Sequence, residues 1–193
     1  MNISILYGGA STEHKISIKT GLAVAEAIQG MYNLDLVDWG NEIYKSPHRL
    51  LDADLVFNAL HGGEGEDGTI QAYLDLHKIA YTGSGSKASK IAMDKNISKL
   101  IAQSVQIPTP NWILIKKDPH AGLKLQNELA RKFTYPYVVK PSNEGSTYGL
   151  SIVKSENELS EAISLAAEYS NEILIEEYIP GRELTVGILG NKV

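Results

Sequence analysis

Short apolar segments alternate with longer amphipathic segments along the first 82 residues, and this alternation constrains the fold more than any other feature. Strands are expected at residues 3–7, 34–37, 55–60 and 79–82, and helices at residues 17–31 and 69–77. The first of these strands is apolar without clear alternation, as expected for a strand that is covered on both faces. This order of elements predicts a parallel sheet with right-handed connections and a ligand site beyond the carboxyl ends of the strands.

A second unit is expected to begin near Gly83, where the run TGSGS is typical of a hinge. Its expected helices are residues 87–106, 121–133 and 155–170, and its expected strands are residues 112–116, 137–140, 150–153, 173–177 and 184–189. Ser155 and Glu158 have the spacing of a capping box. The expected fold class is therefore α/β. The last strand would form a sheet edge without a partner, so we expect the chain to be a piece of a longer protein.

Composition excludes several classes of protein. The chain has 193 residues, a net charge of −5 and no cysteine, so disulfides, thiolate catalysis and cysteine-ligated metals are excluded. The acidic balance argues against a general nucleic-acid or membrane-surface binder. No stretch approaches the roughly 20 apolar residues that span a bilayer, and the first residues lack the pattern of a signal peptide. We therefore expect a cytoplasmic enzyme or binding protein.

The run YVVKPSNEGSTYGLSIVK, residues 137–154, carries the clearest functional signal. Lys140 ends an apolar strand, and the loop after it contains small residues, including Gly145, Ser146 and Thr147. A cation at a strand end, next to the backbone N–H groups of a glycine loop, suits a polyphosphate. An ordinary β-hairpin with a glycine-rich tip explains the same pattern, and these residues alone leave both interpretations open.

Two loops of the first unit place carboxylates next to glycines. In GGASTEHKIS, residues 8–17, Glu13 is suited to a substrate ammonium group, although it equally suits the dipole of the following helix. In LHGGEGEDGT, residues 60–69, His61 follows a buried strand at the edge where sites form in α/β sheets. The same loop contains Glu64, Glu66 and Asp67. These carboxylates are a weak metal signal, and the last of them is better explained as a helix cap.

Two further stretches add a lysine and three carboxylates. Lys95, in AMDKNISK, is by itself an ordinary solvated lysine. The run ILIEEYIPGRELTVGIL places Glu176 and Glu177 at the end of one apolar strand and Glu183 at the start of the next. Such carboxylates can accept hydrogen bonds from an adenine amino group or a ribose hydroxyl. Two lysines for phosphates, strand-end carboxylates for a nucleoside and a zwitterion site near Glu13 together predict one anionic nucleotide site.

These residues resemble the ATP-grasp ligases, and within them the D-alanine–D-alanine ligases. The matching stretches occur in that family's order and spacing: GGASTEHKIS, LHGGEGEDGT, AMDKNISK, YVVKPSNEGSTYGLSIV and LIEEYIPGRELTV. The resemblance covers nearly the whole chain. It implies an N-terminal parallel-sheet, Rossmann-like domain (1–84), a central ATP-grasp subdomain (85–178) and only the beginning of a C-terminal ATP-grasp subdomain (179–193). It also implies an ATP-dependent ligase that joins two D-alanines for peptidoglycan of the cell wall.

The resemblance also implies the site residues. Those expected to contact ATP are Lys95, Lys140, Ser146, Thr147, Glu176, Glu177, Tyr178, Ile179 and Glu183. Glu13 is the expected anchor for the ammonium group of the first D-alanine, and His61 lies near its carboxylate. Ser146 orients this substrate, and the Gly145 N–H is a candidate donor to an oxyanion. Glu13 and Ser146 are thus the residues expected to act in catalysis.

The implied reaction converts the first D-alanine into an acyl phosphate, from which the amine of the second displaces phosphate. Lysines and Mg²⁺, for which Mn²⁺ can substitute, neutralise charge, while loop closure excludes water. The family's metal ligands lie beyond this stretch of sequence, so we expect no metal ligand in the chain and no ligase activity from the chain alone. The resemblance further implies a homodimer for the full-length protein.

Other functions remain open at this point. A related ligase with D-lactate or D-serine as its second substrate would match the same stretches. A non-catalytic nucleotide- or substrate-binding fragment, or a degenerate regulator, would match them as well. An NAD-dependent dehydrogenase is disfavoured, because the glycines at Gly8 and Gly9 lack the GxGxxG spacing.

Overall fold

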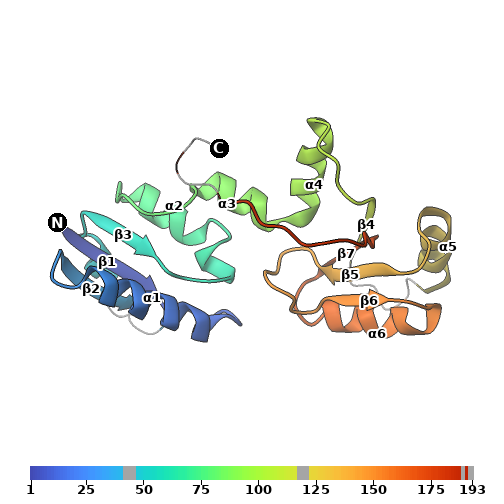
Figure 1. The fold of residues 1–193 in the computed structure, drawn as a ribbon, viewed down its shortest axis with the longest axis horizontal. Coiled ribbons are helices and arrows are strands. Elements are labelled where there is room, and N and C mark those ends of the chain that lie inside the picture. The colour runs from blue at the N-terminus through green and yellow to red at the C-terminus, as the bar shows by residue number, and fades with distance from the viewer. Residues whose placement is uncertain (41–46, 117–121, 188–189, 191–193) are drawn as a thin grey trace.

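The computed structural model describes residues 1–40, 47–116, 122–187 and 190, and it contains two sheets of different type (Figure 1). The N-terminal unit holds a three-stranded sheet in the order β2–β1–β3, in which both strand pairs are parallel. The second unit holds a four-stranded sheet in the order β4–β7–β5–β6, in which all pairs are antiparallel. The predicted α/β class and the parallel N-terminal sheet are confirmed.

The parallel sheet is covered by a helix on each face. Its elements are β1 (Asn2–Tyr7), α1 (His14–Ile28), β2 (Asn33–Asp38), a 3-10 helix (Pro47–Leu50), β3 (Leu55–Asn58), a second 3-10 helix (Gly63–Gly65) and α2 (Thr69–Leu76). Ile3 and Ile5 pack toward α1, while Leu6 packs with Ile70 and Leu74 of α2. Successive residues of a strand face opposite sides of its sheet, so β1 carries buried apolar residues on both faces, as predicted.

Two predicted strands of this unit are shorter than expected. β3 ends at Asn58 instead of Leu60, because the Asn58 side chain accepts the Leu60 N–H at 3.1 Å and turns the chain. The segment predicted as a strand at residues 79–82 forms only an isolated parallel bridge between Val56 and Tyr81. The loops that follow β1 and β3 both leave the carboxyl edge of the sheet, where the sequence predicts a ligand site.

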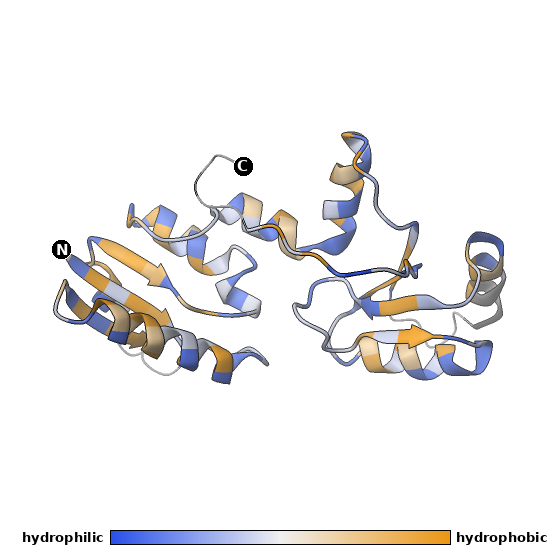
Figure 2. Cartoon of the chain, viewed as in Figure 1, coloured by the Kyte–Doolittle hydropathy of each residue, from blue (hydrophilic) through white to orange (hydrophobic). Residues whose placement is uncertain are grey.

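The antiparallel sheet is covered on one face by two helices. The elements of this unit are α3 (Ser86–Met93), α4 (Lys95–Ser104), β4 (Trp112–Lys116), α5 (Gly122–Lys132), β5 (Tyr137–Pro141), β6 (Ser151–Val153), α6 (Glu156–Ala166) and β7 (Glu172–Glu177). Val139 and Ile175 of the sheet pack with Leu129 of α5 and Leu159 of α6 in one core. Figure 2 shows the result: the strands are mainly hydrophobic, and the helices alternate between hydrophobic and hydrophilic residues.

Three predictions in this unit are wrong. The helix expected over 87–106 is two helices, because Asp94 adopts an extended conformation (φ −80°, ψ 100°) and its side chain caps α4 by accepting the Ile97 N–H. The capping box at Ser155 is altered, since Glu158 accepts the backbone N–H of Lys154 at 2.8 Å and the Ser155 side chain makes no cap hydrogen bond. Residues 184–187 form no strand, and Leu184 is 81% exposed; the remainder of that predicted strand, 188–189, lies outside the described residues.

The two units have separate hydrophobic cores. Among the described residues, none of the core clusters contains residues of both sheets. The domain boundaries expected at residues 84 and 178 remain a prediction. None of the helices in the described ranges has the length and hydrophobicity of a membrane span.

Candidate active site

A cavity of about 650 Å³ lies between the two units and brings together residues that are far apart in the sequence. Its walls include His61 from the loop after β3, Lys95 from the start of α4, and Gly145 and Ser146 from the loop between β5 and β6. These four predicted site residues therefore line one space. Thr147 belongs to the same loop but is not among the lining residues.

Lys140 and Glu176 lie on the face of the antiparallel sheet opposite the α5–α6 core. Because side chains alternate along a strand, Val139 and Ile175 point into the core and their neighbours point away from it. The strand register pairs Lys140 with Leu174, so Glu176 is its diagonal neighbour on β7. The Lys140 ammonium group forms an ion pair with Glu176 Oε1. The tertiary structure thus places Lys140, which is predicted to bind phosphates, in contact with Glu176, which is predicted to bind the nucleoside.

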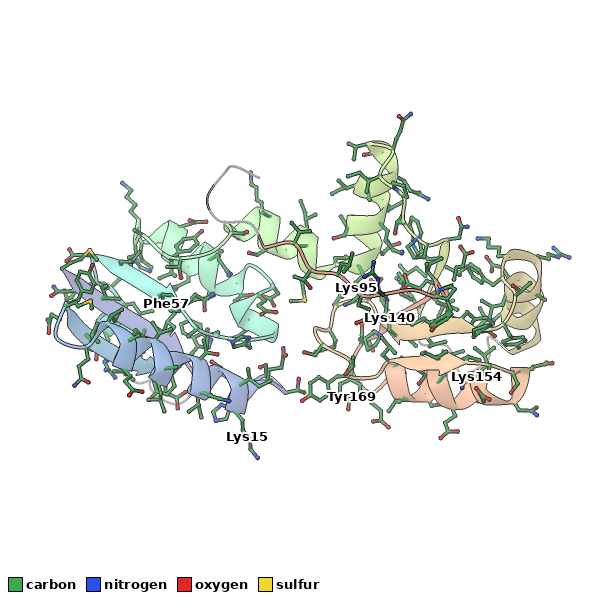
Figure 3. The ribbon with its side chains drawn as sticks, in the orientation of Figure 1. Lys15, Phe57, Lys95, Lys140, Lys154 and Tyr169 are labelled. Atoms are coloured by element: carbon green, nitrogen blue, oxygen red, sulfur yellow. The ribbon has the colours of Figure 1, made fainter. Side chains whose placement is uncertain are left out.

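Lys95 lies beside this pair, at the first residue of α4 (Figure 3). Its side chain donates a hydrogen bond to the backbone carbonyl of Glu144, and its N–H donates to the carbonyl of Ser142 at 3.1 Å. Burial and the charge of Lys140 both lower the pKa of Lys95. Glu144, Glu176 and Asp94 act in the opposite direction, and an anion bound beside the two lysines would likewise favour their charged forms.

The loop between β5 and β6 reaches across to the N-terminal unit. Ser146 has a left-handed backbone, with φ of +54°, and its hydroxyl donates to Glu13 Oε1 at 2.6 Å. Gly145 also approaches Glu13, because a Cβ at Gly145 would lie 3.3 Å from Glu13 Oε2. The predicted catalytic residues Glu13 and Ser146 are therefore in direct contact.

Glu13 is a buried carboxylate, 8% exposed, at the N-terminal cap of α1. Among the described residues no lysine, arginine or histidine forms an ion pair with it. A nearby acid adds to the negative charge: burial and the charge of Glu13 raise the pKa of Glu144, whereas Lys95 lowers it. Glu144 lines the cavity and Glu13 contacts the lining residue Ser146, so an ammonium group bound beside Ser146 would give Glu13 a positively charged partner.

His61 is held at the cavity by its neighbours. Its Nε2 lies 3.0 Å from Thr20 Oγ1, and its Nδ1 lies 4.0 Å from Glu66 Oε1. The other acids of this loop have structural partners, since Glu64 accepts the Trp39 indole N–H and Asp67 accepts the Thr69 N–H. The described residues contain no group of three or more side chains suited to a metal ion.

The remaining residues predicted to bind ATP lie at the end of β7, after β7 or in the loop between β5 and β6, and none of them contacts the lysine cluster among the described interactions. Glu177 accepts a hydrogen bond from the Asn111 side chain at 3.2 Å. Tyr178, Ile179 and Glu183 lie in the exposed segment after β7. Thr147 is exposed, and its carbonyl accepts the Leu150 N–H at 3.2 Å. The contacts expected of these five residues with a nucleotide remain predictions.

Two family models match the chain. The model for the D-ala D-ala ligase N-terminus matches residues 39–84, and the model for the D-ala D-ala ligase C-terminus matches residues 101–193. The chain belongs to the D-alanine–D-alanine ligase family.

Relatives and solved structures agree with this assignment. The chain is 41% identical to a D-alanine–D-alanine ligase of Coprothermobacter proteolyticus, over 97% of the chain and 62% of the relative. It is 40% identical to that of Halalkalibacterium halodurans, over 100% and 62%. The Bacillus anthracis ligase crystallised with ATP superposes with a TM-score of 0.80 at 36% identity, covering 94% of this chain and 60% of that one. The chain therefore spans about three fifths of the length of these ligases.

Sequence reasoning missed two charged residues of the site: Glu144, which lines the cavity, and Lys99. This lysine is 9% exposed, and its ammonium group lies 2.9 Å from Glu176 Oε2. It ends the stretch AMDKNISK, one helical turn after Lys95, so the i, i+4 spacing could have placed both lysines on one face of α4.

Proposed function

We propose that the protein carrying this chain is an ATP-dependent ligase that joins two D-alanines through an acyl phosphate for peptidoglycan synthesis. The observation that carries the proposal is the cavity that lies between the two units, because its lining residues Lys95 and Ser146 contact the lysine cluster and Glu13, respectively. Its lining includes His61, Lys95 and Ser146. The ammonium group of a zwitterionic amino acid suits Glu13, and a nucleotide polyphosphate suits the lysines.

The lysine cluster fits a polyphosphate. Lys95 and Lys140 lie close enough for the charge of Lys140 to lower the pKa of Lys95, and Lys99 adds a third positive charge near Glu176. Lysine ammonium groups act as point charges toward phosphate oxygens. We propose that Lys95 and Lys140 bind the phosphates, and that Ser146 and Thr147 belong to the loop that covers them.

For the nucleoside, we propose hydrogen bonds from Glu176 and Glu183 to the adenine amino group and the ribose. The backbone of Glu177, Tyr178 and Ile179 would read the adenine edge. Support comes from position: β7 ends beside the lysine cluster, and residues 178–187 after it are exposed and belong to no helix or strand.

The buried Glu13 carboxylate and its Ser146 partner fit the first D-alanine. We propose that Glu13 binds its ammonium group and that Ser146 fixes both Glu13 and the substrate. His61 would then lie near the carboxylate, and the Gly145 N–H near the oxyanion that forms on attack of the second D-alanine. The role of these residues is to hold the carboxylate of the first D-alanine next to the γ-phosphate of ATP in a fixed geometry.

Three finer points belong to the same proposal. Mg²⁺ would accompany ATP, although the described residues offer it no set of ligands. The protein works in the cytoplasm, and the full-length form is a homodimer.

The test is product analysis with the protein that contains this chain in full. Incubation with ATP and D-alanine should give D-alanyl-D-alanine and one ADP per dipeptide, and L-alanine should give neither. Competition with D-lactate or D-serine would reveal a related ligase if the mixed product predominated. Binding of ATP without D-alanine-dependent ADP release would point to a non-catalytic binding protein instead.

A further inference from the structure

Lys99 is held at the nucleotide end of the site by three hydrogen-bond acceptors. Its ammonium group donates to Thr109 Oγ1 at 2.7 Å and to the Pro110 carbonyl at 3.0 Å. It also lies 2.9 Å from Glu176 Oε2 and 5.2 Å from the centre of the Trp112 ring. An ammonium group has three N–H donors, so those of Lys99 are fully used within the protein.

Lys140 differs from Lys99 in this respect. Among the described residues its ammonium group has one partner, Glu176 Oε1, which leaves two donors free. The two oxygens of the Glu176 carboxylate are thus divided between two lysines, Lys140 on one and Lys99 on the other. Of the two, Lys140 has the donors available for a ligand.

Glu176 needs a counter-ion at all times because it is only 7% exposed. Suppose that Lys140 were the sole partner of Glu176. If Lys140 then turned to a phosphate, the Glu176 carboxylate would be left buried and unpaired, at a large cost in free energy. Lys99 already occupies the second oxygen, so Glu176 keeps a partner when Lys140 leaves. The cost of recruiting Lys140 to a phosphate falls accordingly.

We propose that Lys99 is a positioning residue: it is the permanent counter-ion of Glu176, and it frees Lys140 to bind the phosphates of the nucleotide. This inference rests on the proposed nucleotide site. In this role Lys99 does not contact the nucleotide, and it affects the binding affinity only of nucleotides that carry phosphates. Binding of a nucleoside without phosphates does not require Lys140 to move, and it should depend much less on Lys99.

The test compares ATP with adenosine by isothermal titration calorimetry on the full-length protein. Lys99→Met should weaken ATP binding about tenfold, a coupling of ordinary size between two sites, and adenosine binding should weaken by less than about threefold. Lys99→Arg keeps the positive charge and should retain most of the ATP affinity. In a Glu176→Gln background, where no carboxylate holds Lys140, Lys99→Met should no longer discriminate between the two ligands.

Other outcomes have definite meanings. Equal losses of affinity for ATP and adenosine in Lys99→Met would overturn the proposal, because Lys99 would then support only the fold. Unchanged affinity for both ligands would also overturn it, because Lys99 would then have no role in binding. A wild-type protein that does not bind ATP would instead overturn the proposed function. Lysine ¹⁵Nζ NMR of the wild type is independent of how Lys99→Met folds: on ATP addition the Lys140 signal should shift and the Lys99 signal should stay. A Lys99 shift as large as that of Lys140 would show that Lys99 itself meets the phosphates.

Discussion

The hydrogen bond between Glu13 and Ser146 joins residues that are 133 positions apart. It links the start of α1 to the loop between β5 and β6, and it fixes the buried Glu13 carboxylate beside Ser146, which lines the cavity. Glu13 has no cationic partner among the described residues. A substrate ammonium group would therefore find both a charge and a defined geometry.

We expect Glu13→Gln to lower kcat/KM for the first D-alanine by about ten- to hundredfold, the range for loss of a charge-assisted hydrogen bond. Ser146→Ala should also lower it, and the double variant should lose less than the two single losses combined, because the two residues act together. Steady-state kinetics on the full-length protein measure this. Glu26→Gln, on the exposed side of the same helix, is the matched control and should leave kcat/KM unchanged.

Lys95 gives ATP binding a pH dependence. Burial and Lys140 lower its pKa, while Glu144, Glu176 and Asp94 act in the opposite direction. As pH rises through this lowered pKa, the lysine loses its charge, so ATP affinity should fall. A bound phosphate favours the charged form, so binding near that pH should take up protons.

Calorimetric titrations at increasing pH, in buffers of different ionisation enthalpy, test this expectation. Lys95→Arg is the control, because a guanidinium group stays charged over the whole range. The variant should show a flatter pH profile and less proton uptake. An equally steep fall in the variant would assign the pH dependence to another group.

At the scale of elements, the structure confirms the hairpin of β5 and β6, while phosphate binding by its loop stays a prediction. It is an antiparallel hairpin, and its long loop also lines the cavity. The loop rejoins β6 at Gly149, whose φ is +69°. A Cβ at this position would lie 2.8 Å from both Pro141 Cγ and Tyr169 Cδ2.

We therefore expect Gly149→Ala to lower the free energy of unfolding by about 2–4 kcal/mol, through backbone strain and overpacking. Gly181→Ala is the control: nothing lies within 4 Å of a Cβ there, and its effect should stay within about 0.5 kcal/mol. Urea denaturation measures both. Equal stabilities for the two variants would mean that the loop adjusts freely at Gly149.

Whole-molecule behaviour should reflect the separate hydrophobic cores of the two units. The chain has two tryptophans, and Trp39 lies in the core of the parallel-sheet unit while Trp112 lies in β4 of the other. Each therefore reports on one unit. Without ligands, the units are expected to unfold as independent cooperative blocks.

Fluorescence-detected urea unfolding of Trp39→Phe and Trp112→Phe tests this, since each variant retains one reporter. The two midpoints should differ. Saturating ATP and D-alanine should raise both, because the proposed site is built from both units. Coincident transitions in the absence of ligand, matched by a circular dichroism curve with a single step, would show that the polar contacts between the units suffice to couple them.

Most elements could be predicted from the sequence, and so could several residues that the structure brings together at the candidate site, although their roles stay predictions. Apolar segments of the right length predicted every strand that formed, and amphipathic spacing predicted α1, α2 and α6. The break at Asp94 was missed because both flanking segments are helical in pattern, and only the cap hydrogen bond to Ile97 ends one and starts the other. The strand expected over 184–187 was wrong because an apolar pattern forms a strand only where another strand satisfies its backbone groups.

The sequence alone determined the α/β class, the parallel first sheet and the family, because periodicity and motif order are local properties of the chain. Tertiary structure alone decided which charges meet. Lys99, Lys140 and Glu176 come from three elements, and the strand register with the packing of α4 makes them one cluster. These ion pairs join segments that are far apart in the sequence. A local sequence motif does not specify how close such segments lie in the folded chain.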